Sequence, residues 1–424
     1  RVLRAMGITR VPVVTVENAC ASGTTAFAEA CEAVRTGRYG RVLALGVEQM
    51  STAFDGAITP EDTDPEGATG LALPALYAMA ATRYLHEGAV TPAQLAAVSV
   101  KNHAHALHNP RAQYSGRYTV DEVLASRMIA DPLTLLQCCP TSDGAAAAVI
   151  GPATGGPREV GVRGVALRSG APWGRRSPHV WGYDIVAETA ADALAAAGLH
   201  AATDVDVVEV HDAFTIGEIV TTEALGLVAP GEGGKAVETG VPALGGAHPV
   251  NPSGGLLSRG HPLGATGLAQ LAEIVWQLRG EAGGRQVEGA RIGLVETMGG
   301  GVSALDGIAC VVAVLEAPWP SWCPTSSGRT PSPIPIPCSP ACASTTRCTG
   351  TSATAPGSSP ATTTSTPRCA IPGSPPTASL PTAGPGSTAT ARTPPSVRRS
   401  GCSRTGWCSR TRPTTPGCAS SSRV

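Results

Sequence analysis

The chain has 424 residues and a formal net charge of −1, because 31 Lys and Arg residues oppose 32 Asp and Glu residues. A nucleic-acid-binding protein would usually show a basic excess, so the charge argues against that class. No stretch reaches the ~20 apolar residues that a membrane span requires, and no signal peptide is visible. Only five of the 13 cysteines precede residue 317, and none has metal-like CxxC spacing. We therefore expect a reduced, cytoplasmic protein without a metal site.

Hydrophobic patterns predict alternating strands and helices up to Glu316. Short continuous apolar runs predict strands covered on both faces, and apolar residues at i, i+3, i+4 and i+7 predict helices. In the first half of the chain, the predicted elements are a strand at 11–16, a helix from about Ser22, a strand from Val42, a helix at 74–87 and a helix from a capping box at Thr91 through Lys101. An irregular segment with short helices follows at 111–135, and then strands at 145–150 and 159–167. The remaining predicted elements are a helix at 187–199, a strand at 205–210, a helix after His261 and a strand from Ile292.

Two segments, residues 17–51 and 257–301, follow one plan. In each, a residue capable of chemistry, Cys20 or His261, stands three positions before a glycine. A predicted helix follows, then a turn rich in Gly and Arg, then a strand that ends in Val-Glu-x-Met. Any two β-α-β units share part of this pattern, but the matching positions of the cysteine and the histidine favour an internal duplication. The predicted fold is α/β, with two related halves packed together.

Cys20 lies between the predicted strand 11–16 and the helix that begins near Ser22. A thiol there is close to the positive end of the helix dipole and to free backbone N–H groups, which favour the thiolate. A free cysteine is more often a buried structural residue. The order strand, Cys, Ser, Gly, helix favours a nucleophile instead.

Two histidines could serve such a thiol. His261 lies in Gly-His-Pro-Leu-Gly-Ala-Thr-Gly, residues 260–267, where glycines and proline predict a rigid turn, and it can act there as a base toward the thiol. His211 follows the strand 205–210, and ligands of α/β folds gather at such strand ends. It could donate to a developing oxyanion, although a satisfied surface histidine fits the spacing equally well.

Three further histidines, His103, His105 and His108, follow one another closely. No acidic cluster accompanies them and their spacing fits no standard metal site, so we interpret them as part of a loop after a helix.

These motifs together resemble the thiolase superfamily over residues 1–316. Asn18–Gly23 is similar to its nucleophile motif and Glu48–Ser51 to the block that follows. Asp143–Ala147 resembles its Asp-Gly-Ala-Ala run, and Gly260–Gly267 resembles its catalytic-histidine motif most specifically. The resemblance implies a layered αβαβα fold with an N-terminal half at 1–155 and a C-terminal half at 156–316.

Within the superfamily, the chain is most similar to the sterol-carrier-protein-x type and to thiolase-like lipid-transfer proteins. There, as in residues 211–214 here, His-Asp-x-Phe replaces the Asn-Glu-x-Phe of ordinary thiolases, and residues 101–113 resemble the same branch. The resemblance implies acyl transfer between an enzyme cysteine and coenzyme A, with an acyl-CoA as substrate, no tightly bound cofactor, and a homodimer or larger homo-oligomer.

The resemblance also implies a role for each site residue. Cys20 would carry the acyl group and His261 would activate it. His211 and His261 would help to form an oxyanion hole, with the backbone N–H near Gly300 in a second one. Gly300 and Ser253 are assigned to binding the coenzyme A substrate.

The sequence departs from the family in two places. Ordinary thiolases have a second, acid–base cysteine in Cys-x-Gly-Gly-Gly, where this chain has Thr297, whose hydroxyl titrates far too high to replace a thiol. The start at Arg1, with 19 residues before Cys20, predicts that the first core strand of the fold is missing.

Four hypotheses follow. The first is an acyltransferase acting on a fatty or sterol-derived acyl-CoA. The second is a thiolase-like retro-aldolase on a CoA-linked side chain, working with a small accessory protein. The third is a non-catalytic acyl-CoA or lipid-binding protein, and the fourth is an inactive fragment.

The composition changes abruptly after Ala317. Residues 317–424 contain no Asp, Glu, Lys, His, Asn, Gln, Phe, Tyr or Met, but they contain eight cysteines. Such a segment has too little apolar material to offset chain entropy, so we expect disorder. A natural low-complexity tail and a disulfide-rich module are alternatives. Out-of-frame translation of a GC-rich gene explains the residue set better.

Overall fold

The computed structural model describes residues 2–53, 56–59, 65–174, 176–300 and 305–318. These residues belong to one of the two compact units into which the chain divides, Arg1–Ser332. The predictions for the tail beyond residue 318 therefore lie outside the described residues. Among the described helices, none is long and apolar enough to cross a bilayer.

Helices and strands alternate along the chain, as the hydrophobic pattern predicted. The helices are α1 (Val2–Ala5), α2 (Ser22–Arg35), α3 (Pro65–Ala68), α4 (Leu73–His86), α5 (Pro92–Ala106), α6 (Val120–Ala125), α7 (Tyr183–Ala197), α8 (Thr215–Ala224), α9 (Gly233–Glu238), α10 (Gly255–Arg259) and α11 (Leu263–Arg279). The strands are β1 (Val42–Gln49), β2 (Met128–Ala130), β3 (Leu133–Thr134), β4 (Asp143–Ile150), β5 (Gly161–Arg168), β6 (Val207–Glu209), β7 (Ile292–Gly299) and β8 (Ala309–Glu316).

Two sheets carry the architecture, one from each predicted half. In the first, β1 and β4 pair antiparallel from Val42 opposite Ile150 to Gln49 opposite Asp143. The second sheet has the order β5-β8-β7-β6, in which β7 pairs antiparallel with β8 and parallel with β6. A separate hairpin pairs β2 with β3. The strands that end the two repeated segments, β1 and β7, thus lie in different sheets.

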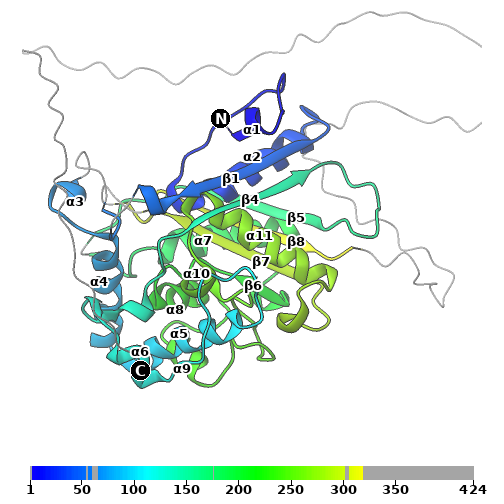
Figure 1. Cartoon of the computed structure of the whole chain (residues 1–424). Helices are drawn as coiled ribbons and strands as arrows, with labels where there is room; N and C mark the ends of the chain where they lie inside the picture. The colour runs from blue at the N-terminus through cyan, green and yellow to red at the C-terminus, as the bar shows by residue number, and fades with distance from the viewer. Residues whose placement is uncertain (1, 54–55, 60–64, 175, 301–304, 319–424) are drawn as a thin grey trace, which may run out of the picture. The chain divides into compact units, whose positions relative to one another are not determined.

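Helices α2 and α11 lie side by side between the two sheets (Figure 1). Both contact β1 and β4 on one side and strands of the second sheet on the other. Phe27 of α2 and Leu268 of α11 share a buried cluster with Val295 of β7 and Ala313 of β8. Helix α7 covers the opposite face of the second sheet. This stacking puts the first turns of α2 and α11 at the centre of the unit.

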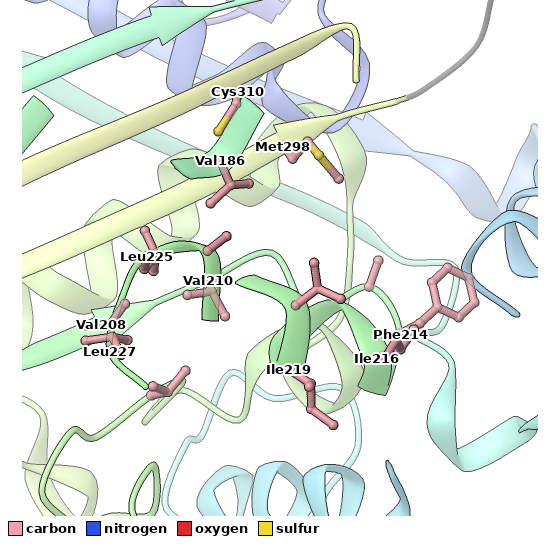
Figure 2. Packing of buried hydrophobic residues seen from close by; sticks show 14 of the residues in the cluster. Val186, Val208, Val210, Phe214, Ile216, Ile219, Leu225, Leu227, Met298 and Cys310 are labelled. Carbon is pink, nitrogen blue, oxygen red and sulfur yellow. The ribbon is translucent and has the colours of Figure 1, made fainter. Parts of the chain in front are cut away.

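A second buried cluster supports the turn that contains His211 (Figure 2). Val210 and Phe214 flank this turn, and their side chains are buried with Ile216 and Ile219 of α8. Because apolar anchors on both sides hold the turn, the polar residues between them have little freedom to move.

Three structural expectations from the sequence were wrong in part. Residues 11–16 form no strand; Val14 is 79% exposed, and among the described residues no strand pairs with this segment. Strand β1 is covered on one face only, since Leu43 is 38% and its cross-strand partner Val149 is 68% exposed. Helix α5 continues beyond Lys101 to Ala106, so His103 and His105 belong to the helix. The capping box at Thr91 is confirmed.

Candidate active site

Glycines allow the two central helices to approach closely enough for Cys20 and His261 to meet. A Cβ atom on Gly23 of α2 would lie 2.8 Å from the carbonyl oxygen of Gly264 in α11. One on Gly46 of β1 would lie 2.2 Å from the same oxygen, and one on Gly267 would lie 2.5 Å from Cγ2 of Thr24. Real Cβ atoms do not approach backbone this closely. The glycines three positions after Cys20 and His261 thus form the crossing point of the two halves.

The nucleophile candidate stands on a tight turn at the start of α2. Cys20 lies in a 3-10 turn, Ala19–Ala21, and Ala19 has a left-handed φ of 49°. Such a conformation is rare for a residue with a side chain and concentrates at functional sites. Ser22 stabilises the turn, since its hydroxyl donates to the Ala19 carbonyl at 2.6 Å and accepts from Asn18 N–H at 2.9 Å.

The predicted pair of catalytic side chains is in contact. Sγ of Cys20 lies 3.2 Å from Nε2 of His261. Both residues are buried, with 5% and 3% of their surface exposed. The backbone N–H of His261 donates to Ser142 Oγ at 2.9 Å. Thr141 and His261 also form an isolated parallel β-bridge. The segment before β4 therefore holds the histidine in place.

Thr266 determines which nitrogen of His261 faces the thiol. Its Oγ1 lies 2.7 Å from Nδ1 of His261 and donates its own proton to the Pro262 carbonyl at 3.0 Å. With that proton committed, Oγ1 accepts the hydrogen of Nδ1. Nε2 is then unprotonated and presents its lone pair to Cys20. This tautomer is the one that can take the thiol proton.

His211 completes the cluster. Its ring lies 5.1 Å from the ring of His261, centroid to centroid, at an interplanar angle of 70°. One donor atom each of Cys20, His211 and His261 lies within 4.8 Å of the other two. His211 is 3% exposed, and among the described residues neither of its ring nitrogens has a hydrogen-bond partner. The structure therefore contradicts the alternative of a satisfied surface histidine, because this ring is buried and unsatisfied.

Burial, rather than the helix dipole, dominates the ionisation of these groups. It raises the pKa of the Cys20 thiol to about 12, although the backbone N–H of Gly300 acts in the opposite direction. Burial lowers the pKa of His211 to about 4 and holds that of His261 well below its ordinary value. The backbone N–H groups and helix dipole that were expected to favour the thiolate are therefore outweighed by burial. At neutral pH the site holds a neutral thiol beside two neutral imidazoles, so the nucleophile needs its base.

A buried polar network fixes the backbone around His211. The backbone N–H of His211 donates to Glu296 Oε2 at 2.9 Å. Asp212 accepts from Asn102 Nδ2 at 2.7 Å and from the backbone N–H of Leu256 at 2.7 Å. Burial raises the pKa of Glu296 to about 7. These contacts hold the His211 turn from two sides.

The two residues assigned to substrate binding have different surroundings. The backbone N–H of Gly300 interacts with the Cys20 thiol and lowers its pKa. Ser253 is fully buried, and its Oγ and N–H both donate to the carboxylate of Glu209, at 2.8 and 3.0 Å. Contact of Ser253 with coenzyme A therefore stays a prediction, which this arrangement does not support.

His103 and His105 serve the fold. Nδ1 of His103 lies 2.9 Å from the Ser99 carbonyl. His105 places Nδ1 3.0 Å from the Asn251 carbonyl and accepts from Leu244 N–H on Nε2 at 3.1 Å. Both ring nitrogens of His105 are thus engaged by the backbone, which leaves neither of them for a metal ion.

Sequence reasoning missed the supporting residues, above all Thr266, Glu296, Asn102 and Ser142. Thr266 stands inside the histidine motif, five residues after His261, where its hydroxyl reaches back over the first turn of α11. Glu296 is part of the repeated Val-Glu-x-Met, which was a signal for both strand ends. Asn102 and Ser142 contact their partners from 110 and 119 residues away, so no local pattern could have revealed them.

Comparisons with known proteins agree with this geometry. The family model "Thiolase, N-terminal domain" matches residues 1–154, and the model "Thiolase C-terminal domain-like" matches residues 176–310. An acetyl-CoA acetyltransferase of Methanothermobacter thermautotrophicus is 47% identical over 303 residues, which are 69% of this chain and 78% of that protein. Sterol carrier protein 2 of Oryctolagus cuniculus is 39% identical over 331 residues, 72% of this chain. The match spans only 59% of the length of that relative.

A solved structure titled Ltp2-ChsH2(DUF35) aldolase has a similar fold, with a TM-score of 0.62 and 26% identity over 74% of this chain and 83% of that chain. The two family models, the archaeal relative and the Cys–His geometry lead to one assignment. The chain belongs to the thiolase family and is an acyltransferase of that family.

Proposed function

We propose that the chain transfers acyl groups between an acyl-CoA thioester and Cys20, with His261 as the proton acceptor. The observation that carries the proposal is the 3.2 Å separation of Cys20 Sγ and His261 Nε2, in the tautomer that Thr266 selects. The archaeal relative named acetyl-CoA acetyltransferase and the relative named sterol carrier protein 2 support an acyl-CoA substrate. Within that class we propose fatty or sterol-derived acyl groups.

The proposed half-reaction balances without a cofactor. The thiol proton of Cys20 moves to Nε2 of His261 as Sγ attacks the thioester carbonyl carbon. Negative charge develops on the carbonyl oxygen, where an N–H of neutral His211 stabilises it. The C–S bond to coenzyme A then breaks, and the leaving thiolate takes the proton back from His261. Cys20 is left as a thioester and coenzyme A as a free thiol.

A second candidate, a thiolase-like retro-aldolase, is favoured by two observations. The hydroxyl of Thr297 donates to Gln270 Oε1 at 2.6 Å, so it is not free to act on a substrate α-carbon as the second cysteine of ordinary thiolases does. The similar solved structure is titled an aldolase with a second component. In this alternative the chain would cleave a CoA-linked side chain together with a small accessory protein.

Acyl-enzyme trapping tests the proposal. The full chain is incubated with acetyl-, long-chain fatty and sterol-side-chain acyl-CoA, and free coenzyme A and acylated peptides are measured. Peptide mapping is needed because the chain has 13 cysteines. We expect acylation of the Cys20 peptide with matching release of coenzyme A.

Matched variants distinguish the two candidates. Cys20→Ala should abolish both signals, while Cys31→Ala, which removes a half-buried cysteine of α2, should retain them. Cleavage of a CoA-linked side chain that survives Cys20→Ala would reject the acyltransferase and favour the retro-aldolase. The homo-oligomer, the accessory protein and the cytoplasmic location stay predictions that this experiment does not address.

A further inference from the structure

Three side chains at the site offer one sulfur and two nitrogen donors to a common point. Sγ of Cys20 and one ring nitrogen each of His211 and His261 all lie within 4.8 Å of one another. In a tetrahedral zinc site, metal–ligand bonds of about 2.0–2.3 Å put neighbouring donors roughly 3.5 Å apart. The distance between Cys20 Sγ and His261 Nε2, 3.2 Å, is already close to that value. Small side-chain rotations would bring the other two donor–donor distances to the same value.

The histidines also have the electronic form that a metal requires. Nε2 of His261 presents a lone pair, because Thr266 accepts the hydrogen on Nδ1. Such a hydrogen bond from the distal nitrogen is the usual support of a metal-bound histidine. His211 is 3% exposed, and in the described part of the chain its two ring nitrogens have no hydrogen-bond partner. A buried, unsatisfied imidazole with a ring nitrogen within 4.8 Å of a thiol sulfur is an independent sign that the cluster accommodates a ligand.

We propose that Cys20, His211 and His261 together bind one Zn²⁺ ion, and that the bound ion inhibits the enzyme. Zinc binds both imidazole nitrogen and thiolate sulfur, so two imidazoles and one thiolate can hold it, with the fourth position left to water. Hard cations such as Mg²⁺ prefer oxygen donors, so they should not compete. On binding, Cys20 loses its proton to solvent, a Zn–S bond forms, and zinc gives up water ligands. No oxidant or reductant takes part.

Inhibition follows because the metal occupies the groups that the reaction uses. The sulfur lone pair of Cys20 and the Nε2 lone pair of His261 would both be coordinated, so neither nucleophile nor base would remain. Metal binding itself does not depend on the proposed reaction, and only the inhibitory part rests on the proposed function. The two parts therefore need separate measurements.

Alkylation of Cys20 measures metal binding without any assay of turnover. The full chain is treated with iodoacetamide in chelator-buffered Zn²⁺, and the Cys20 peptide is quantified by mass spectrometry. Peptide resolution matters because eight cysteines beyond residue 317 can also bind zinc. We expect Zn²⁺ to protect Cys20, Mg²⁺ to leave its alkylation unchanged, and a chelator to restore it. Acyl-CoA turnover should fall and recover over the same zinc concentrations.

Single-ligand variants decide whether the three residues act together. His211→Asn keeps a side chain of similar reach but removes the imidazole. Loss of even an outer-shell partner costs metal sites about 10- to 100-fold in affinity, so this variant should need at least tenfold more zinc for half-protection. The control, His86→Asn, removes an exposed histidine at the end of α4 and should leave the zinc concentration for half-protection unchanged.

The results separate four outcomes. Absence of protection by Zn²⁺ in the wild type would overturn the proposal, and so would equal protection in His211→Asn and wild type. Protection of Cys20 that requires His211 would support the metal site even if the chain shows no acyltransferase activity. Zinc-sensitive turnover without protection of Cys20 would place the inhibitory metal elsewhere and overturn the assignment.

Discussion

The hydroxyl of Thr297 donates to Oε1 of Gln270 at 2.6 Å, and both residues are fully buried. Gln270 in turn donates from Nε2 to the carbonyl oxygen of Glu296 at 3.1 Å. This pair joins β7 to the middle of α11. The position where ordinary thiolases have their second cysteine is therefore committed to packing in this chain.

Substitution of Thr297 should affect stability more than chemistry. Thr297→Val would leave Oε1 of Gln270 buried without a donor, which costs about 1–3 kcal/mol of unfolding free energy. Thr297→Ser retains the hydroxyl and serves as the control. Denaturant unfolding and acyl-CoA turnover check the two effects separately. A loss of turnover in Thr297→Val with unchanged stability would instead make the hydroxyl part of the chemistry.

Thr266 should control catalysis through the tautomer of His261. Thr266→Val removes the acceptor for Nδ1, so the imidazole loses both its orientation and its preference for a free Nε2. A neutral hydrogen bond contributes about 0.5–1.5 kcal/mol, so kcat should fall by up to roughly tenfold, with KM little changed. Thr266→Ser should keep most of the wild-type rate. Equal rates in Thr266→Val and the wild type would exclude this role.

Substitution by alanine should have very different effects at two glycines where the halves cross. In Gly46→Ala the new methyl carbon would lie 2.2 Å from the Gly264 carbonyl oxygen, so β1 and α11 must separate. In Gly264→Ala the nearest atom is the flexible Oε2 of Glu48 at 3.3 Å, which can move. We expect Gly46→Ala to lose at least about 1–3 kcal/mol of stability, and most activity, while Gly264→Ala loses much less. Thermal melting and turnover of the two variants provide the test.

The pH dependence of alkylation should reveal the neutral thiol. Burial raises the pKa of Cys20 to about 12, so the thiolate is a small fraction at pH 7 and grows roughly tenfold for each pH unit from pH 8 to 11. Iodoacetamide labelling of the Cys20 peptide should rise in the same way. A plateau near neutral pH would contradict this view, because it would indicate a resting thiolate paired with a charged His261.

Stability should respond to the same shift in the alkaline range. A thiol whose pKa is about 12 when folded, and near its ordinary value of 9.0 when unfolded, keeps its proton more tightly in the native state. Its stabilising contribution is fully present below pH 9 and is lost as the pH rises toward 12. Relative to Cys20→Ala, the wild type should therefore lose stability between pH 9 and 12. Equal slopes of melting temperature against pH in the two proteins would rule out this linkage.

Sequence reasoning identified the chemistry better than its surroundings. The start of a helix just after Cys20 and the glycine-rich turn of His261 are local patterns, so these two helices and the pairing of the two residues could be predicted. The plan shared by residues 17–51 and 257–301 is consistent with both side chains standing at the starts of neighbouring helices. His211 could be placed at a strand end, although spacing alone did not separate a catalytic from a surface role.

The protonation states and the supporting contacts could not be predicted in the same way. The helix dipole was expected to favour the thiolate of Cys20, but burial has the larger effect, and burial depends on both sheets. The strand expected at 11–16 did not form, because an apolar run cannot build a β-ladder without a strand that pairs with it. Ser142 and Asn102 reach the site through long-range contacts that no spacing encodes.

The distance in sequence between the two partners has a consequence for synthesis of the protein. Cys20 and His261 are 241 residues apart, so a ribosome completes nearly the whole of both halves before the nucleophile meets its base. Until α11 emerges, the nascent chain has a thiol without a proton acceptor. Translation that stops early therefore yields an inert polypeptide, and reactivity begins only with the finished pair of halves.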